Sequence, residues 1–74
     1  MTVVASVPKR PGEEIRISVE EFQGKTRVNV RVWWEDDFGE WKPGKQGISM
    51  TAEQFRAVWG NCQAVDAVLK EKGQ

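Results

Sequence analysis

Residues 26–34 read TRVNVRVWW, and this stretch decides the fold. Apolar and polar side chains alternate along it, which is typical of a strand with one buried face. The three valines share the apolar face. The opposite face carries Arg27, Asn29, Arg31 and Trp33. Trp33 and Trp34 are adjacent and therefore point to opposite faces, so at most one of them is expected in the core.

Shorter strands are predicted on both sides of this segment. Residues 15–19 (IRISV) alternate in the same way, and residues 20–25 form a turn in which the glycine is the flexible point. The composition of residues 36–39 predicts a second turn. Residues 41–47 contain a proline and a glycine, which favours a bent or edge segment, and the apolar residues 48–50 are expected to pair.

A helix is predicted from Thr51 to about Lys70. Thr51 and Gln54 have the spacing of a capping box, in which a hydroxyl and an amide satisfy backbone N–H groups at the helix start. An apolar stripe at helical spacing consists of Phe55, Val58, Trp59, Cys62, Val65 and Leu69. Gly60 lies inside the stripe and is a candidate for a bend. Strands followed by one amphipathic C-terminal helix indicate an α+β fold, in which one helix cannot cover both faces of the sheet.

The 74 residues predict one domain over residues 12–74, preceded by a flexible leader over residues 1–11 in which residues 3–7 could form a short edge strand. A domain this small is marginal alone and usually needs a disulfide, a metal or a partner chain. Cys62 is the only cysteine and there is no histidine, so neither an internal disulfide nor a metal site is expected. No cofactor is expected, and association into a homodimer is the predicted source of stability.

The sequence argues against an enzyme. Without histidine, no Ser-His-Asp or Cys-His set can form. Asp36 and Asp37 are adjacent turn acids that are expected to be solvated, and Cys62 belongs to the helix stripe as a packing thiol. Residues 1–7 lack the basic region of a signal peptide, and no run reaches the roughly 20 apolar residues of a membrane span. We therefore expect a cytoplasmic protein.

Charge is unevenly distributed along the chain. The net charge is zero, with 11 basic and 11 acidic residues, and taken alone this argues against nucleic-acid binding. Residues 22–34 hold three cations and no acid, residues 35–40 hold four acids, and residues 41–50 hold two cations and no acid. If the two basic blocks share a surface, a neutral protein can carry a local positive field.

Aromatic side chains are interleaved with these cations. The set comprises Phe22, Lys25, Arg27, Arg31, Trp33, Trp34, Trp41, Lys42 and Lys45. This mixture suits single-stranded nucleic acid, because cations track phosphates and aromatic faces stack bases, whereas a duplex hides the base faces. The same residues also fit a protein-binding or purely structural sheet, with Trp41 and Trp59 as packing residues. RNA binding on this surface is not separable from DNA binding by sequence.

Three segments, ISVEEFQGK (17–25), VNVR (28–31) followed by Trp34, and GEWKPGKQGISM (39–50), together resemble the C-terminal domain of the transcriptional coactivator positive cofactor four. The similarity covers about residues 12–70, and KPGKQGIS is its most specific part. It implies a curved four-stranded antiparallel sheet followed by a kinked helix. It also implies a homodimer held largely by the helices, with channels for single strands or melted duplex.

The resemblance also implies roles for individual residues. Phe22 and Trp34 would stack bases, and the phosphate-contacting cations would be Lys25, Arg31, Lys42 and Lys45. Arg27 has no basic counterpart in the family pattern and is a candidate from the interleaving of cations and aromatic residues alone. The dimer contacts expected on the helix are Phe55, Val58, Trp59, Cys62 and Val65. Strand parity places Arg31 with Trp33, whereas the resemblance pairs it with Trp34, and a bulge or strong twist near the strand end would reconcile the two.

The expected function is sequence-tolerant binding of single-stranded DNA by a homodimer, in transcription, replication or repair. Glu20, Gln23 and Gln46 stand where the family often has basic residues, so weaker binding with a shallower salt dependence is expected. The acidic, serine-rich extension of the eukaryotic coactivator is not in the sequence, which suggests a prokaryotic-type, nucleoid-associated relative for which a coactivator role does not follow. The alternative is a protein-interaction module that docks a transcription or repair factor.

Overall fold

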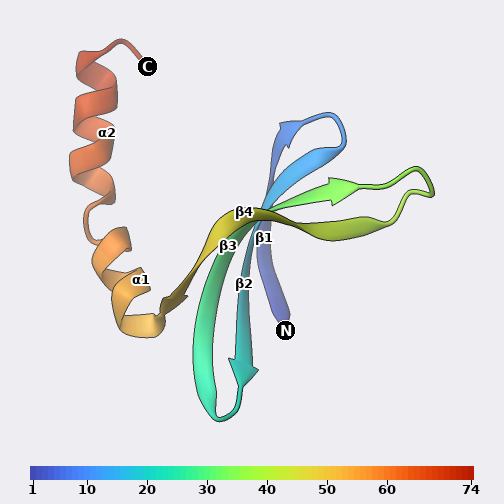
Figure 1. The fold of residues 1–74 in the computed structure, drawn as a ribbon. Coiled ribbons are helices and arrows are strands. Elements are labelled where there is room, and N and C mark those ends of the chain that lie inside the picture. Colours follow the sequence, from blue (N-terminus) through green and yellow to red (C-terminus); the bar gives the residue numbers. More distant parts are fainter.

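Four strands form one antiparallel sheet in the order of the sequence, and a helical arm follows (Figure 1). The strands are β1 (Thr2–Arg10), β2 (Glu13–Phe22), β3 (Lys25–Glu35) and β4 (Trp41–Thr51), and the arm consists of α1 (Ala52–Trp59) and α2 (Cys62–Glu71). The computed structural model describes residues 1–74. It confirms the predicted α+β fold, in which a four-stranded antiparallel sheet is followed by one bent C-terminal helix.

β1 is an edge strand that pairs with β2 along almost its whole length. The sequence predicts only a short strand over residues 3–7 of a leader, because two prolines and a glycine nearby disfavour regular structure. The structure extends the strand to Arg10. An edge strand needs backbone hydrogen bonds on one side only, so Pro8 lies opposite Glu14 without ending the pairing, and a register shift follows it.

The β2–β3 hairpin is closed by Gln23 and Gly24, whose φ angles are both positive, at 53° and 75°. Two consecutive positive φ angles are typical of a type I′ turn, whose twist matches that of the paired strands. Phe22 and Lys25 therefore face each other at the end of the ladder. This tight turn places the first aromatic residue and the first cation of the predicted binding set together at the hairpin tip.

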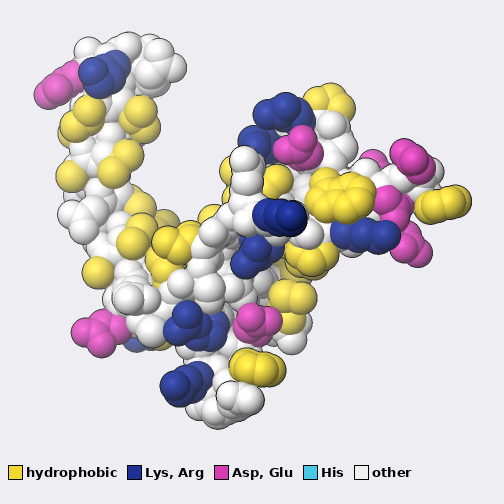
Figure 2. All heavy atoms as spheres, viewed as in Figure 1, with side chains coloured by type: hydrophobic (Ala, Val, Ile, Leu, Met, Phe, Trp, Pro, Cys, Tyr) yellow, Lys and Arg dark blue, Asp and Glu magenta, His cyan; other side chains and the backbone are white.

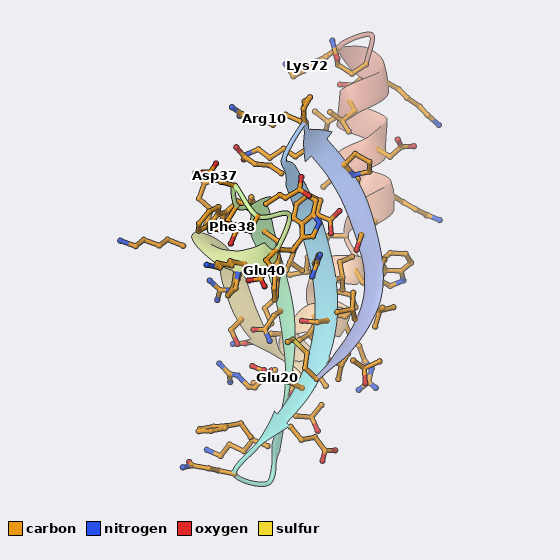
Figure 3. All side chains as sticks on the ribbon, turned by 90° about the vertical axis from the view of Figure 1, so that its right-hand side faces the viewer. Arg10, Glu20, Asp37, Phe38, Glu40 and Lys72 are labelled. Atoms are coloured by element: carbon orange, nitrogen blue, oxygen red, sulfur yellow. The ribbon has the colours of Figure 1, made fainter.

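Asp36 organises the β3–β4 turn. Its Oδ1 accepts the backbone N–H groups of Phe38 and Glu40 at 2.9 Å each. The pKa of Asp36 lies below its usual range, and the largest cause is the hydrogen bond from the backbone N–H of Glu40. Lys42 also lowers this pKa, with its Nζ 3.1 Å from Oδ2. Figure 3 labels Asp37, Phe38 and Glu40 at this turn, where Phe38 is 91% exposed. The acidic turn is therefore ordered by hydrogen bonds from its backbone N–H groups to the side chain of Asp36.

The apolar face of the sheet carries a small core. Val28 is paired with Val19 on one side and with Met50 on the other, so the three side chains share this face. Phe55 of α1 is half-buried beside Val19 and Val28 at the rim of an apolar hollow. Val28 and Met50 are the only apolar residues that are buried. The face predicted from the valines of residues 26–34 is thus the one on which α1 packs.

The helical arm starts and bends where the sequence predicts. Thr51 Oγ1 accepts the N–H of Gln54, and Gln54 Oε1 accepts the N–H of Thr51, both at 3.0 Å, which is the predicted capping box. The bend lies at Gly60 and Asn61. Asn61 Nδ2 donates to the carbonyl of Ala57 at 2.8 Å, and the backbone N–H of Asn61 turns to the carbonyl three residues back. The side chain of Asn61 therefore competes with the backbone and interrupts the helix.

The chain exposes more surface than a compact monomer of its size. Figure 2 shows α2 standing away from the sheet with apolar side chains along it, and no residue of α1 or α2 is buried. The accessible surface is 6096 Å², compared with about 4,600 Å² expected for 8.4 kDa. The radius of gyration is 14.5 Å, compared with about 11 Å for a compact domain. Neither helix has the length and hydrophobicity that crossing a membrane requires.

Candidate nucleic-acid interface

Four of the predicted binding residues lie on the polar face of the sheet, opposite the core. Strand parity and the unbroken β2–β3 register place Phe22, Lys25, Arg27 and Arg31 there. Phe22 is 66% exposed at the hairpin tip. None of the three cations has a carboxylate within 4.0 Å, since the five ion pairs of the chain involve other basic residues. Together they form a row of unpaired cations that ends in an exposed aromatic ring.

Arg31 is held by a bulge in β4. Between the pairs Arg31–Gly47 and Trp33–Pro43, β3 advances by two residues while β4 advances by four. Arg31 Nη1 donates to the carbonyl of Gly44, in the bulge, at 3.0 Å. The two glycines are required by close approach: a Cβ on Gly44 would lie 2.8 Å from the carbonyl oxygen of Val32, and one on Gly47 would lie 2.9 Å from Cα of Arg31. The glycines of KPGKQGIS thus fit the β4 backbone around Arg31.

Replacing Gly47 tests this close fit. We expect Gly47→Ala to force β4 away from Arg31 and to lower the free energy of unfolding by about 1–3 kcal/mol, the usual cost of overpacking. Urea denaturation followed by tryptophan fluorescence measures the change. Lys45→Ala, an exposed truncation two residues away that removes no hydrogen bond or ion pair, should stay within about 0.5 kcal/mol of the wild type. An unchanged unfolding midpoint for Gly47→Ala would contradict the fit.

Trp34 lies on the other face of the sheet, with Lys42 opposite it in the register. The predicted bulge exists, but it lies in β4, and β3 keeps its parity through Trp34. The bulge therefore does not bring Trp34 to the face that carries Arg31. Lys42 Nζ is 5.9 Å from the Trp34 ring and is paired with Asp36. Lys45 lies close by, beside Trp34 at the rim of a shallow hollow on this face.

Sequence reasoning missed a stacked cluster on the polar face. The guanidinium carbon of Arg16 lies 4.4 Å from the ring centre of Trp33 and 5.4 Å from that of Trp41. Arg16 also pairs with Glu14. The cluster joins β2, β3 and β4, and it explains why Trp33 and Trp41 are half-buried on a face without a helix. The alternation of polar and apolar residues in β2 and β3 predicts that Arg16 and Trp33 lie on the polar face. Only the register between the strands shows that Trp41 lies next to them.

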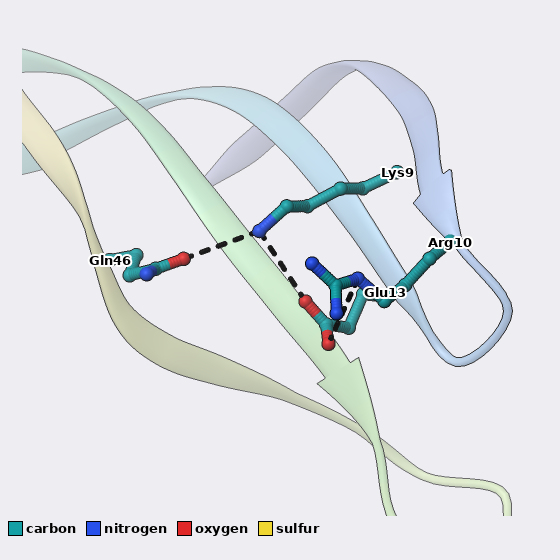
Figure 4. A network of polar contacts seen from close by, with 4 residues as sticks. All are labelled: Lys9, Arg10, Glu13 and Gln46. Carbon is teal, nitrogen blue, oxygen red and sulfur yellow. Dashed lines mark hydrogen bonds and ion pairs between the residues drawn. The ribbon is translucent and has the colours of Figure 1, made fainter.

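A polar network ties the two edge strands together at the open end of the sheet (Figure 4). Lys9 Nζ of β1 lies 3.6 Å from Glu13 Oε1 and donates to Gln46 Oε1 of β4 at 3.4 Å. Arg10 lies 3.7 Å from the same carboxylate. Two of the chain's cations are therefore directed to Glu13 and lie apart from the unpaired cations of the polar face.

The residues predicted as dimer contacts remain largely uncovered within one chain. Val58, Trp59 and Val65 are 57%, 68% and 58% exposed, and Cys62 is an exposed free thiol. Phe55 differs, because it packs against the sheet. Most of the apolar helix stripe thus has no partner in the chain.

An open antiparallel sheet with a row of unpaired cations on its polar face and a single projecting helical arm defines a small open-sheet α+β domain. Residues 9–60 match the model of the family described as Transcriptional Coactivator p15 (PC4), and the chain belongs to this family. The resemblance inferred from the sequence is therefore confirmed. The family is one of coactivators, in agreement with the prediction that the chain is not an enzyme.

Relatives of known structure share the fold. The PC4 homologue BPSL1147 of Burkholderia pseudomallei superimposes with a TM-score of 0.80 at 31% identity, over 88% of each chain. The MoSub1–ssDNA complex matches with a TM-score of 0.69 at 30% identity, over 93% of this chain and 80% of the other. The coactivator KELP of Arabidopsis thaliana is 32% identical over 62 residues, which are 84% of this chain and 37% of KELP. The chain spans between about a fifth and a half of the length of the curated coactivators it matches.

Proposed function

We propose that this protein binds single-stranded DNA along its sheet, without catalysis and with tolerance for sequence. The observation that carries the proposal is the polar face on which Phe22 and the unpaired cations Lys25, Arg27 and Arg31 lie together. Aromatic stacking and phosphate contacts are the two interactions that sequence-tolerant binding of single strands uses. A relative of the same fold, MoSub1, is known in complex with ssDNA, which supports the proposal.

The remaining predicted binding residues extend the proposed path of the DNA strand around an edge of the sheet. Trp34, Lys42 and Lys45 lie on the apolar face of the sheet. β4 is an edge strand, so a DNA strand can pass around it from the polar face to the apolar face. A strand that follows the polar face to Arg31 can cross β4 at its bulge and reach Lys45. The path then ends on Trp34, which is 43% exposed and available for stacking. In this proposal the bulge, besides holding Arg31, is where the DNA changes face.

We further propose that the protein works as a homodimer whose helical arms cover each other. The accessible surface exceeds that of a compact monomer by about 1,500 Å², whereas a standard interface buries about 800 Å² per partner. The uncovered surface includes Val58, Trp59 and Val65 of the arm. A core of two buried apolar residues is too small to hold 74 residues folded without such cover. A role in transcription is proposed from the coactivator relatives.

Titration of a fluorescent 20-nucleotide oligothymidine tests the proposed function. Binding is expected at 50 mM NaCl. Because at most five cations of each protomer contact phosphates, the slope of log affinity against log salt should be no steeper than about −3.5 for each protomer that the strand contacts. Affinity should then fall by about ten- to a hundredfold between 50 and 200 mM. A duplex of the same length should bind more weakly. Folded protein that does not bind the oligothymidine at low salt would exclude the function.

A further inference from the structure

We propose that a hollow in the polar face of the sheet is a subsite for a single base of the bound strand and that it favours guanine. The hollow is lined by Met1, Ser18, Glu20, Asn29, Arg31, Trp33 and Pro43. The proposal rests on the single-strand binding proposed above and adds to it one position at which the protein reads the base.

The floor of this hollow is unusual because it is polar and buried. Ser18 and Asn29 are 3% and 9% exposed and are the only polar residues buried in the chain. They are cross-strand partners in the middle of β2 and β3. The hydroxyl of Ser18 and the Oδ1 of Asn29 have no hydrogen-bond partner in the protein, and neither is sealed from the surface. Because both atoms are accessible from the hollow, a base that enters it can replace the water on them.

The orientation of the Asn29 amide follows from its neighbour. Asn29 Nδ2 donates to Glu20 Oε1 at 3.0 Å. An ionised carboxylate only accepts hydrogen bonds, so the amino group must face Glu20 and the carbonyl oxygen is left for the hollow. The second carboxylate oxygen of Glu20 also has no partner in the chain. Two acceptors, one of them charged, are therefore available on two side chains that line the hollow and are hydrogen-bonded to each other.

This acceptor pair selects among the bases by their donors. On its Watson–Crick edge, guanine presents two neighbouring donors, N1–H and the 2-amino group, whereas adenine, cytosine and thymine each present one donor beside acceptors. A base that lies against the part of Trp33 that Arg16 leaves open to the hollow, and turns this edge toward Glu20 and Asn29, satisfies both acceptors only if it is guanine. Protein groups that accept from a base edge in this way are an established means of base readout.

In this proposal Arg31 contacts a phosphate at the rim of the hollow, and Glu20 contacts the base. Arg31 uses one nitrogen to hold the carbonyl of Gly44, and its other donors remain for a phosphate. Glu20 has no cation within 4.0 Å and forms no ion pair in the chain. Figure 3 shows Glu20 on β2, toward the β2–β3 hairpin. A carboxylate on a DNA-binding face repels phosphates unless it contacts a base, and the subsite supplies that contact.

Single substitutions in an oligothymidine 12-mer test the subsite. We expect a central guanine to raise affinity about fivefold over a central adenine in competition titrations. Inosine, which lacks the 2-amino group, should lie between them. In Glu20→Gln one acceptor becomes a donor while Asn29 keeps its partner, so the guanine preference should disappear. Glu21→Gln removes the same charge on the other face of β2 and should keep the preference.

The outcomes separate the subsite from the function it rests on. If the folded protein binds every 12-mer with equal affinity, single-strand binding holds and the subsite is wrong. If Glu20→Gln tightens all oligonucleotides equally and keeps the preference, Glu20 only repels phosphates, and the subsite is also wrong. If no oligonucleotide binds at low salt, the proposed function itself fails. Circular dichroism of each variant confirms that the sheet is intact.

Discussion

Val65→Glu is expected to convert the protein from a dimer into a largely unfolded monomer at micromolar concentration. Val65 is 58% exposed in the single chain, where a glutamate would change stability by no more than about 0.5 kcal/mol. In the proposed dimer the same side chain is buried. Each carboxylate then costs several kcal/mol, and a twofold interface carries two of them. The size of the effect thus distinguishes a covered arm from an exposed one.

Sedimentation velocity and far-UV circular dichroism measure this result together. Gln63→Glu is the matched control, since it adds the same charge to the same helix about 200° away from Val65 around the axis. It should leave the dimer and its unfolding temperature unchanged. A Val65→Glu protein that sediments as a dimer with the wild-type unfolding temperature would show that this side of the arm is not the interface.

Phe22→Ala should weaken oligothymidine binding by about 1–3 kcal/mol, which is about five- to 150-fold, because each base stacked on an aromatic ring contributes that much. Phe22 is 66% exposed at the hairpin tip, so its removal should leave the unfolding temperature unchanged. Trp34→Ala should have a similar effect if the strand crosses β4 to the reverse face. Fluorescence anisotropy at 50 mM NaCl measures each variant.

Phe38→Ala is the control for these two variants. Phe38 is 91% exposed, but it lies in the acidic β3–β4 turn beside Asp37, where a DNA strand is repelled. Its removal should therefore leave affinity unchanged. Wild-type affinity for Phe22→Ala would contradict stacking at the hairpin. An effect of Phe22→Ala without one of Trp34→Ala would confine the DNA to the polar face.

Local patterns allow most of the fold to be predicted from the sequence. The alternation of residues 26–34 determines which side chains meet the core, and Thr51 with Gln54 determines where the helix begins. The bend is only half predictable. Gly60 marks its place, but the bond from Asn61 to the carbonyl of Ala57 appears only once the helix is built. The sequence predicts too short a β1, because prolines disfavour strands in general, although an edge strand tolerates them.

The candidate site is less predictable because it depends on register between strands. Parity alone gives the common face of Arg27 and Arg31, and the hairpin adds Phe22 and Lys25. No local pattern shows that Ser18 lies opposite Asn29, or that a bulge in β4 leaves the parity of β3 unchanged. A family resemblance suggests the role of a residue, but it does not show on which face of the sheet that residue lies. For this reason the resemblance could not show that Trp34 and Arg31 lie on opposite sides of the sheet.

The order of the strands has a consequence for how the chain folds. Each strand pairs only with its neighbour in sequence, so every hairpin can close through a short loop and the sheet needs no long-range search. The helical arm, in contrast, makes few contacts with its own sheet and in the proposed dimer must find a second chain. Closure of the hairpins is then a first-order event, whereas burial of the arm, on which the stability of the sheet depends in the proposed dimer, is second order. Dilution should therefore slow the second-order event, so that the rate at which a newly made chain reaches its stable fold depends on the concentration of other copies.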